Sequence, residues 1–211
     1  MKVRRIMLAD DHTLVLEALR KLLEPQCDVV GTVTDGRALV ELALELKPDA
    51  VLVDIAMPLL SGLNAIQQLK AKMPEVKLIC LTMHEDPDLA NEAMRNGASG
   101  FLLKTSPASE LFHAVQEVLR GKTYITPKIV SAMEESFIRD PRPKERSRSL
   151  TPRQREVTQL LAEGKSLKQA AHLLNVTPRT VAFHKYQIMD ELRLKTTADL
   201  VRFAIRNHLV T

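Results

Sequence analysis

Five short apolar runs alternate with longer amphipathic stretches through the first 120 residues, and this alternation restricts the possible folds more than any other feature. The longer stretches place apolar residues at the spacing of a helix face, so the pattern indicates a strand followed by a helix, five times over. Strands joined through helices run parallel, with helices on both faces of the sheet. The sequence predicts an α/β domain of (βα)5 type, with strands at Ile6–Ala9, Val29–Val33, Ala50–Val53, Lys77–Leu81 and Gly100–Leu103 and helices at Leu14–Leu23, Ala38–Leu46, Leu63–Lys72, Leu89–Asn96 and Glu110–Leu119.

A second, all-α domain of four helices is predicted after a linker. The alternation stops near residue 125, and a short helix to Ile138 is followed by DPRPKERSRS, whose proline, serine and alternating charges indicate a hydrated linker. Beyond it, capping patterns begin helices at Thr151 and Ser166, Asn175–Thr177 separates two helices, and Thr197 caps the last. The expected division is a domain over 1–124, a partly helical linker over 125–148 and a helical domain over 149–211.

The two halves of the chain differ in charge. Residues 1–125 hold 14 Lys and Arg against 17 Asp and Glu, whereas residues 126–211 hold 16 against 9, a net charge of +7. A basic domain suits a polyphosphate partner such as double-stranded DNA, although a solvated lysine-rich face explains the charge equally well. Two cysteines cannot form a disulfide framework, and no apolar run is long enough for a membrane span or signal peptide. We therefore expect a cytoplasmic protein without membrane contact.

Four of the five expected strands finish on a functional group, namely Asp10 with Asp11, Asp54, Thr82 and Lys104. Because ligands of open α/β sheets bind beyond the carboxyl ends of the strands, we expect these groups to converge. Three carboxylates would suit Mg2+, which prefers oxygen ligands. A carboxylate beside Mg2+ can attack phosphorus, and a hydroxyl and an ammonium group would then hold the phosphoryl oxygens. Acidic residues at strand ends also serve as helix caps, but this would not account for the whole set.

The motifs LADDHTLV, VDIAMPLLSG, LTMHE and GFLLK resemble the receiver domain of bacterial two-component response regulators over residues 4–120. The resemblance implies a flavodoxin-like fold with Asp54 as the phospho-acceptor. It implies Asp11 as a direct and Asp10 as a more indirect Mg2+ ligand, with the backbone carbonyl of Ala56 as a further ligand. Thr82 and Lys104 would hold the phosphoryl group, and Phe101 occupies the position of the family's switch aromatic, where an ordinary core ring is equally plausible.

The positions two residues after Asp54 and Thr82 influence hydrolysis of the acyl phosphate in this family, and here they are Ala56 and His84. Ala56 cannot orient a water molecule through its side chain, so we expect slow self-dephosphorylation unless His84 compensates. Phosphohydrolases with an aspartate nucleophile are the enzyme alternative. They carry a second acid at the position of Ala56, and the absence of that acid disfavours this class.

The segment from Leu150 to Leu192 closely resembles the LuxR-type helix-turn-helix of the NarL/FixJ subfamily, and with the last helix the resemblance covers residues 150–211. On its recognition helix Val181, His184, Ile188 and Leu192 recur at the spacing of a core face. The other face is expected to meet a DNA major groove, although the two aromatic side chains on it would also suit docking on the receiver. The DNA-binding candidates are Lys165, Thr177, Arg179, Thr180, Ala182, Phe183, Lys185, Tyr186 and Lys195.

The last helix carries an apolar stripe that the resemblance identifies as a dimer surface, although packing within the domain is equally plausible. Its members are Leu200, Val201, Ala204 and Ile205. The sequence thus predicts a transcription factor, not an enzyme, that takes phosphate on Asp54 from a sensor histidine kinase in a Mg2+-dependent reaction and thereby controls homodimerisation and DNA binding. The alternative is a constitutive DNA-binding protein whose receiver serves only as a dimerisation module.

Overall fold

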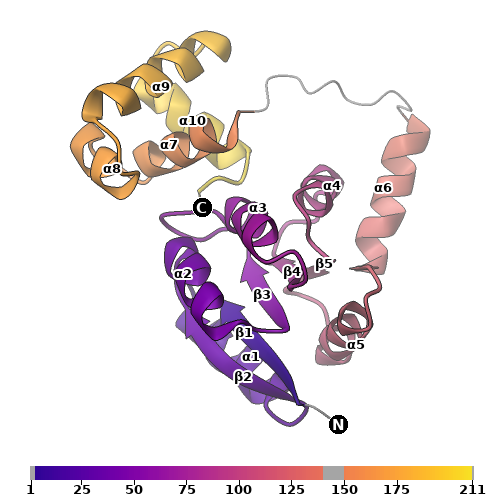
Figure 1. The fold of residues 1–211 in the computed structure, drawn as a ribbon. Helices are drawn as coiled ribbons and strands as arrows, with labels where there is room; N and C mark the ends of the chain where they lie inside the picture. Colours follow the sequence, from indigo (N-terminus) through magenta and orange to yellow (C-terminus); the bar gives the residue numbers. More distant parts are fainter. Residues whose placement is uncertain (1–2, 140–149, 211) are drawn as a thin grey trace.

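The computed structural model describes residues 3–139 and 150–210, and the predicted DPRPKERSRS linker lies outside these ranges. A parallel sheet in the order β2-β1-β3-β4-β5-β6 forms the centre of the N-terminal domain (Figure 1). The five predicted strands are confirmed within a few residues. The strands are β1 Arg4–Ala9, β2 Cys27–Val33, β3 Ala50–Asp54, β4 Lys77–Thr82, β5 Gly100–Leu103 and β6 Tyr124–Ile125.

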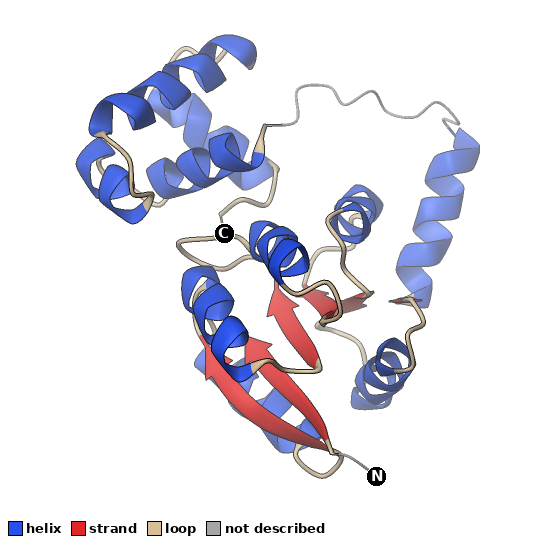
Figure 2. Cartoon of the chain, viewed as in Figure 1, coloured by secondary structure: helices blue, strands red, loops and turns tan. Residues whose placement is uncertain are grey.

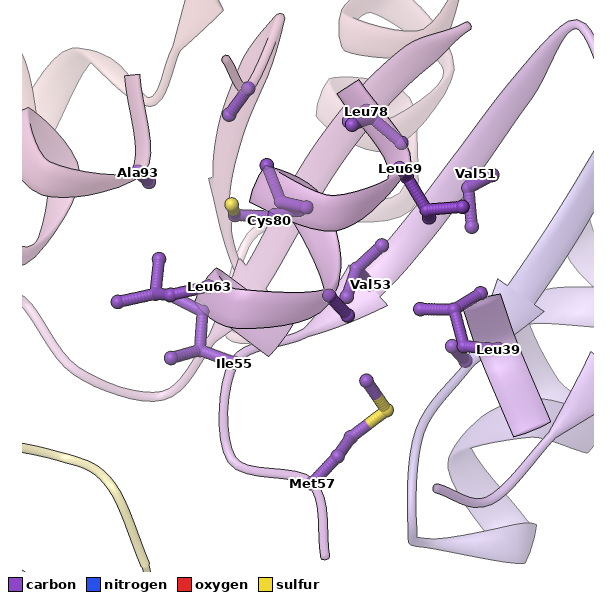
Figure 3. Packing of buried hydrophobic residues seen from close by; sticks show 14 of the residues in the cluster. Leu39, Val51, Val53, Ile55, Met57, Leu63, Leu69, Leu78, Cys80 and Ala93 are labelled. Atoms are coloured by element: carbon purple, nitrogen blue, oxygen red, sulfur yellow. The ribbon is translucent and has the colours of Figure 1, made fainter. Parts of the chain in front are cut away.

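Helices cover both faces of the sheet, as Figure 2 shows. Alternate strand residues point to opposite faces, so Ile6 and Leu8 pack with α1 and α5, while Met7 and Ala9 pack with α2, α3 and α4. Figure 3 shows the second of these cores, in which Val51, Val53 and other strand residues lie against the helices. These helices are α1 Thr13–Leu23, α2 Gly36–Leu46, α3 Gly62–Lys72, α4 Pro87–Arg95 and α5 Ala108–Leu119.

The sheet contains a sixth strand that the sequence pattern did not predict. Tyr124 pairs with Gly100 and Ile125 with Phe101, so β6 extends the sheet beyond β5. The following helix, α6 Pro127–Arg139, inserts Ile129 into the same core as α4. A two-residue strand is too short to show a period of two, which is why the sequence indicated only a helix here. The predicted boundary at residue 124 therefore falls within β6.

The C-terminal domain contains the four predicted helices, α7 Pro152–Ala162, α8 Leu167–Leu173, α9 Pro178–Glu191 and α10 Thr197–Arg206. Thr151 and Ser166 form capping boxes as expected, whereas the cap of α10 is Thr196, one residue earlier than predicted. Val157, Leu160, Val181 and other apolar residues close a separate core. Among the described residues, no helix is both long enough and apolar enough to cross a membrane.

Candidate phosphorylation site and nucleic-acid interface

The polar groups predicted from the strand ends meet at one edge of the sheet. Asp10 directly follows β1, Asp54 and Thr82 are the last residues of β3 and β4, and Lys104 directly follows β5. In the sheet, β2 lies on one side of β1 and β3 lies on the other, so the strand order changes direction between β1 and β3. The connections that follow β1 and β3 therefore lead to opposite faces of the sheet and leave a crevice between them. Parallel pairing of the central strands thus places residues from four distant segments at the same end of the sheet.

Lys104 bridges the two most buried carboxylates. Its Nζ lies 2.7 Å from Asp10 Oδ2 and 2.9 Å from Asp54 Oδ2. Asp10 is 0% and Asp54 4% exposed, so the ion pairs are shielded from bulk water. In such surroundings the carboxylates depend on the ammonium group, because each would otherwise be a buried charge beside a second charge of the same sign.

The same environment shifts the acidity of the site. Burial raises the pKa of Asp54 to about 6, and the charge of Asp10 adds to this effect, although Lys104 and a backbone hydrogen bond from Ala56 act in the opposite direction. Burial opposes the charge on Lys104, but hydrogen bonds and charges of Asp10 and Asp54 outweigh it and raise the pKa of the ammonium group. At neutral pH Asp54 is therefore mostly ionised, although burial makes its charged form less favourable than that of an exposed aspartate.

The acidic residues form a pocket whose chemistry fits a divalent metal ion. Ligand atoms of Asp10, Asp11, His12 and Asp54 all lie within 4.8 Å of one another. Asp10 Oδ2 and Asp11 Oδ1 are buried. Lys104 Nζ lies 2.7 Å from the first oxygen and His12 Nδ1 lies 2.7 Å from the second, and each carboxylate oxygen has a further lone pair for a cation. Three carboxylates and one ammonium group leave net negative charge, which a hard divalent cation would compensate.

The remaining predicted site residues lie in or just after β3, β4 and β5, in different surroundings. Thr82 is buried, and its Oγ1 accepts a hydrogen bond of 3.1 Å from the backbone N–H of His84. Phe101 is fully buried in β5, pointing into the core next to α4. Ala56 is partly exposed in the loop after Asp54, and its methyl group offers no hydrogen bond to a water molecule there.

The predicted DNA-binding residues lie on and around α9. Val181 and Ile188 are fully buried in the domain core, as predicted, whereas Phe183 is 64% and Tyr186 67% exposed. Thr177 caps the helix, and its Oγ1 accepts a hydrogen bond of 3.2 Å from Thr180 N. Of the other candidates, Arg179 and Lys195 are exposed, and Lys165, Ala182 and Lys185 are partly buried.

The apolar stripe of α10 divides between two surfaces. Leu200 and Ala204 are fully buried in the domain's own core, so they have no area left for a partner chain in this arrangement. Val201 is partly buried and Ile205 is 49% exposed. Of the four residues, Val201 and Ile205 therefore keep exposed area, because the core of the four-helix domain covers Leu200 and Ala204.

Two further residues of these sites were not predicted. His12 follows the acidic pair, and its Nδ1 lies 2.7 Å from Asp11 Oδ1 and 3.3 Å from Asp10 Oδ1. The sequence could have indicated this contact, because His12 directly follows Asp10 and Asp11. Gln159 on α7 donates to the backbone of the loop that follows Asp54, and no sequence period could have indicated a contact between residues 102 apart.

Two family models match the chain. Residues 6–116 match the response regulator receiver domain, and residues 148–204 match the luxR family of bacterial regulatory proteins. The first match covers the strands that carry the acidic pocket, and the second covers the helices that carry the exposed aromatic face. Both resemblances inferred from the sequence motifs are therefore confirmed.

Relatives of known name match along the whole chain. The oxygen regulatory protein NreC of Staphylococcus carnosus is 35% identical, over 98% of this chain and 99% of the relative, and the transcriptional regulatory protein MctR of Rhizobium johnstonii is 32% identical, over 98% and 95%. The RcsB response regulator of Salmonella typhimurium has a similar structure, with a TM-score of 0.67 and 26% identity over 96% and 97% of the two chains. The flavodoxin-like domain and the helix-turn-helix domain together establish that this chain belongs to the NarL/FixJ-type response regulators, which are phosphorylation-controlled transcription factors and not conventional enzymes.

Proposed function

We propose that Asp54 is the phospho-acceptor and that a sensor histidine kinase is its physiological donor. The observation that supports this most directly is the contact of Lys104 Nζ with Asp54 Oδ2, at 2.9 Å, in a buried pocket. An oxygen of Asp54 attacks the donor's phosphorus, a P–O bond to the aspartate forms, and the bond between phosphorus and the donor nitrogen breaks. The Thr82 hydroxyl then donates to a phosphoryl oxygen, and Lys104 pairs with the added negative charge.

The metal that fits this chemistry is Mg2+. Asp10, Asp11, Asp54 and the Ala56 carbonyl would hold it, with His12 orienting the Asp11 carboxylate. When bound, Mg2+ supplies positive charge to the oxygens of the transferring phosphoryl group. The protein's own part is to keep Asp54 ionised and to position the hydroxyl of Thr82 and the ammonium group of Lys104.

The experiment that tests the proposal is phosphorylation of the full chain by acetyl phosphate, with and without Mg2+, followed by intact-mass analysis and size measurement. We expect one phosphoryl group to be added only with Mg2+, and a shift toward dimer in the phosphorylated sample. No adduct under conditions in which a control receiver is modified would contradict the proposal and would favour constitutive DNA binding.

We propose further that α9 enters the major groove of double-stranded DNA, with a homodimer reading an inverted repeat. The solved complex of the response regulator RcsB with DNA, which matches this chain at a TM-score of 0.61 and 26% identity, supports the same partner here. The exposed rings of Phe183 and Tyr186 would contact bases, and Arg179 in the first turn would contact the phosphate backbone. On α10, Val201 and Ile205 would contribute to the dimer.

These roles predict two different effects on DNA binding. Arg179→Ala should weaken binding to every duplex and reduce the slope of log affinity against log salt by about 1, because one phosphate contact is lost. Tyr186→Ala should instead reduce discrimination between a duplex selected from a random pool and an unselected duplex, by roughly 1–3 kcal/mol. Anisotropy titrations at several salt concentrations measure both. Lys21→Ala, an exposed position in the N-terminal domain, is the control, and equal loss for both duplexes in Tyr186→Ala would contradict base contact.

The side chain at position 56 predicts the lifetime of the phosphorylated form. Ala56→Asn should accelerate dephosphorylation by roughly 10-fold or more, since an amide can orient the attacking water and the rate responds strongly to such positioning. The decay of the phosphorylated fraction, followed by intact mass, measures it. Ala56→Val, which adds no polar group, should not accelerate the decay. An equal acceleration by both substitutions would show that the size of the side chain at position 56, and not its hydrogen bonding, sets the dephosphorylation rate.

A further inference from the structure

A hollow lies in the C-terminal domain, where the turn after α9 meets α10. Its volume is about 410 Å3, which is within the range of small-ligand sites. Two of its basic side chains, Arg193 and Lys195, come from the turn, and two others, Arg202 and Arg206, come from α10. We call this feature the α10 hollow. It shares no residue with the acidic pocket of the N-terminal domain.

The positive charge of the α10 hollow is only partly compensated. Four basic side chains and one carboxylate line it, which leaves a net charge of +3. Asp199 pairs with Arg202, whose Nη2 lies 2.9 Å from Oδ1. Arg193, Lys195 and Arg206 are exposed and have no ion-pair partner among the residues that the structure describes. A hollow lined by charges of one sign concentrates the electrostatic potential and attracts ions of the opposite sign, so this one favours an anion.

One carboxylate joins the turn to α10 and holds the two walls of the hollow together. Asp199 Oδ2 accepts hydrogen bonds from the backbone N–H groups of Lys195 at 3.2 Å and Thr196 at 2.9 Å, and its Oδ1 accepts from Arg202 at 2.9 Å. Hydrogen bonds from Thr196 lower the pKa of Asp199, so the carboxylate is charged at neutral pH. Because the protein already fixes the turn and Arg202, less conformational freedom is lost when a ligand binds.

The α10 hollow also has an apolar part. Leu194 and Phe203 line it, and both pack against the core of the domain while remaining partly exposed. A partly exposed aromatic ring can stack on a planar ring of a ligand. Guanidinium groups, in turn, bind phosphate oxygens with two parallel hydrogen bonds. The combination fits a ligand that joins phosphate groups to a planar ring.

The backbone of bound DNA is another source of phosphate near this domain, and Lys195 was among the DNA-binding residues expected from the sequence. Arg179, the proposed backbone contact, lies in the first turn of α9, whereas Arg193 follows the opposite end of this helix, about 20 Å away at 1.5 Å per residue. Contacts with a duplex backbone use cations and hydrogen-bond donors, and they would leave Phe203 without a partner. The apolar part therefore favours a free nucleotide.

We propose that the α10 hollow binds a free nucleotide of the nucleoside di- or triphosphate class, in which Arg193, Arg202 and Arg206 pair with the phosphates and Phe203 stacks on the base. The site is independent of Asp54 and of its phosphorylation. Val201 and Ile205, the proposed dimer contacts, directly precede Arg202 and Arg206 in α10, so a bound nucleotide lies beside that surface. The nucleotide gives the C-terminal domain a chemical input that is separate from the phosphorylation of the N-terminal domain.

The test measures binding of ATP, ADP and inorganic tripolyphosphate to the full chain by isothermal titration calorimetry. Mg2+ is left out, so that the phosphate charges stay uncompensated. We expect one nucleotide per chain, with ATP bound roughly 5-fold more tightly than tripolyphosphate or more, because only ATP has a base that stacks on an aromatic side chain. Phe203→Leu, which keeps an apolar side chain against the core, should remove most of this preference. Absence of saturable ATP binding, or equal affinity of wild type for ATP and tripolyphosphate, would overturn the proposal.

The variant Arg193→Gly separates ligand binding from folding. Arg193 has φ of 55°, in the left-handed region that glycine adopts more easily, so the variant should melt at the wild-type temperature or above. Its affinity for ATP should nevertheless fall roughly 10-fold, since one charge-assisted contact with phosphate is lost. The matched control is Lys168→Gln, which removes a positive charge from an exposed position on α8 and should bind ATP like wild type. Equal losses in both variants would show that ATP responds only to the overall charge of the domain, and the proposal would fail.

A competition experiment distinguishes the free nucleotide from the DNA backbone. Arg202→Gln and Arg206→Gln should each weaken ATP binding roughly 10-fold, while the affinity for a DNA duplex, measured by anisotropy, stays within about 2-fold of wild type. A duplex should also fail to displace a fluorescent ATP analogue from the wild-type chain. Displacement of the analogue by the duplex, or parallel losses of ATP and DNA affinity in both variants, would assign these cations to the DNA interface and overturn the proposal.

Discussion

Replacing Asp54 with Asn is expected to abolish phosphorylation of the chain. The amide removes the negative charge and the nucleophilic oxygen while preserving the shape of a side chain that is 4% exposed. Intact-mass analysis after incubation with Mg2+ and acetyl phosphate should show the mass of one phosphoryl group on wild type and none on the variant. The shift toward dimer and the accompanying change in DNA affinity should disappear with it.

The matched control for this result is Asp28→Asn, at an exposed position in β2 that pairs with Arg5, at the opposite end of β1 from Asp10. It removes the same charge from the same domain and should be phosphorylated like wild type. An adduct that persists in Asp54→Asn would mean that another carboxylate accepts the phosphoryl group. Peptide mapping after reduction of the acyl phosphate with borohydride would then identify that carboxylate.

Lys104→Met should give the largest change in stability. The ammonium group is the shared partner of Asp10 and Asp54, and its loss leaves two buried carboxylates without a counter-charge. Removing one partner of a buried ion pair costs about 3–5 kcal/mol, so the N-terminal transition in calorimetry should fall by roughly 10 °C at pH 7.5. Mg2+ should recover part of this loss, because it binds the folded form and compensates the same charge.

The stability that Lys104→Met loses should increase as the pH rises. Since the pKa of Asp54 in the folded chain is about 6, above its value of about 3.9 in an unfolded chain, the folded form binds the additional proton between these values. The contribution of Asp54 to stability is therefore greatest below pH 4 and falls as pH rises through 6. Without Lys104 the pKa of Asp54 rises further, so the free energy of unfolding falls more steeply with rising pH. The stability of Lys104→Met should therefore be closest to that of wild type in acid.

The control for this prediction is Lys72→Met, at the exposed end of α3, which should melt like wild type at every pH. If Lys104→Met lost stability on acidification relative to wild type, or lost less than about 1 kcal/mol at pH 7.5, the pocket would not be held by charge compensation. That result would mean that water screens the charges of Asp10 and Asp54 although both side chains are buried.

The sequence was sufficient to predict that the residues of the acidic pocket lie at one edge of the sheet, because this placement follows from backbone periodicity. Asp10, Asp54, Thr82 and Lys104 were placed together from the strand ends alone, and parallel pairing does place them at one edge. Val181 and Ile188 were likewise assigned to the core of the second domain from their spacing, and both are fully buried. These features depend on local pattern, which one sequence contains.

Other features depend on which surface covers which, and the sequence does not contain that information. For Leu200 and Ala204 the sequence left open a dimer surface and packing within the domain, because an apolar stripe indicates only that something covers it, and here the domain's own core covers both residues. Gln159 on α7 is fully buried, whereas glutamine side chains are mostly exposed to solvent. Only the position of the N-terminal domain explains its burial. Contacts between domains were therefore beyond prediction from periodicity.

The short strand β6 has a consequence for how the chain can be divided. The edge of β5 is paired with Tyr124 and Ile125, and α6 completes the adjoining core through Ile129. A truncation after residue 124 would break this pairing and expose an apolar edge that could recruit strands from other molecules. A fragment of the N-terminal domain that keeps this edge paired and this core closed therefore has to include β6 and the part of α6 that carries Ile129.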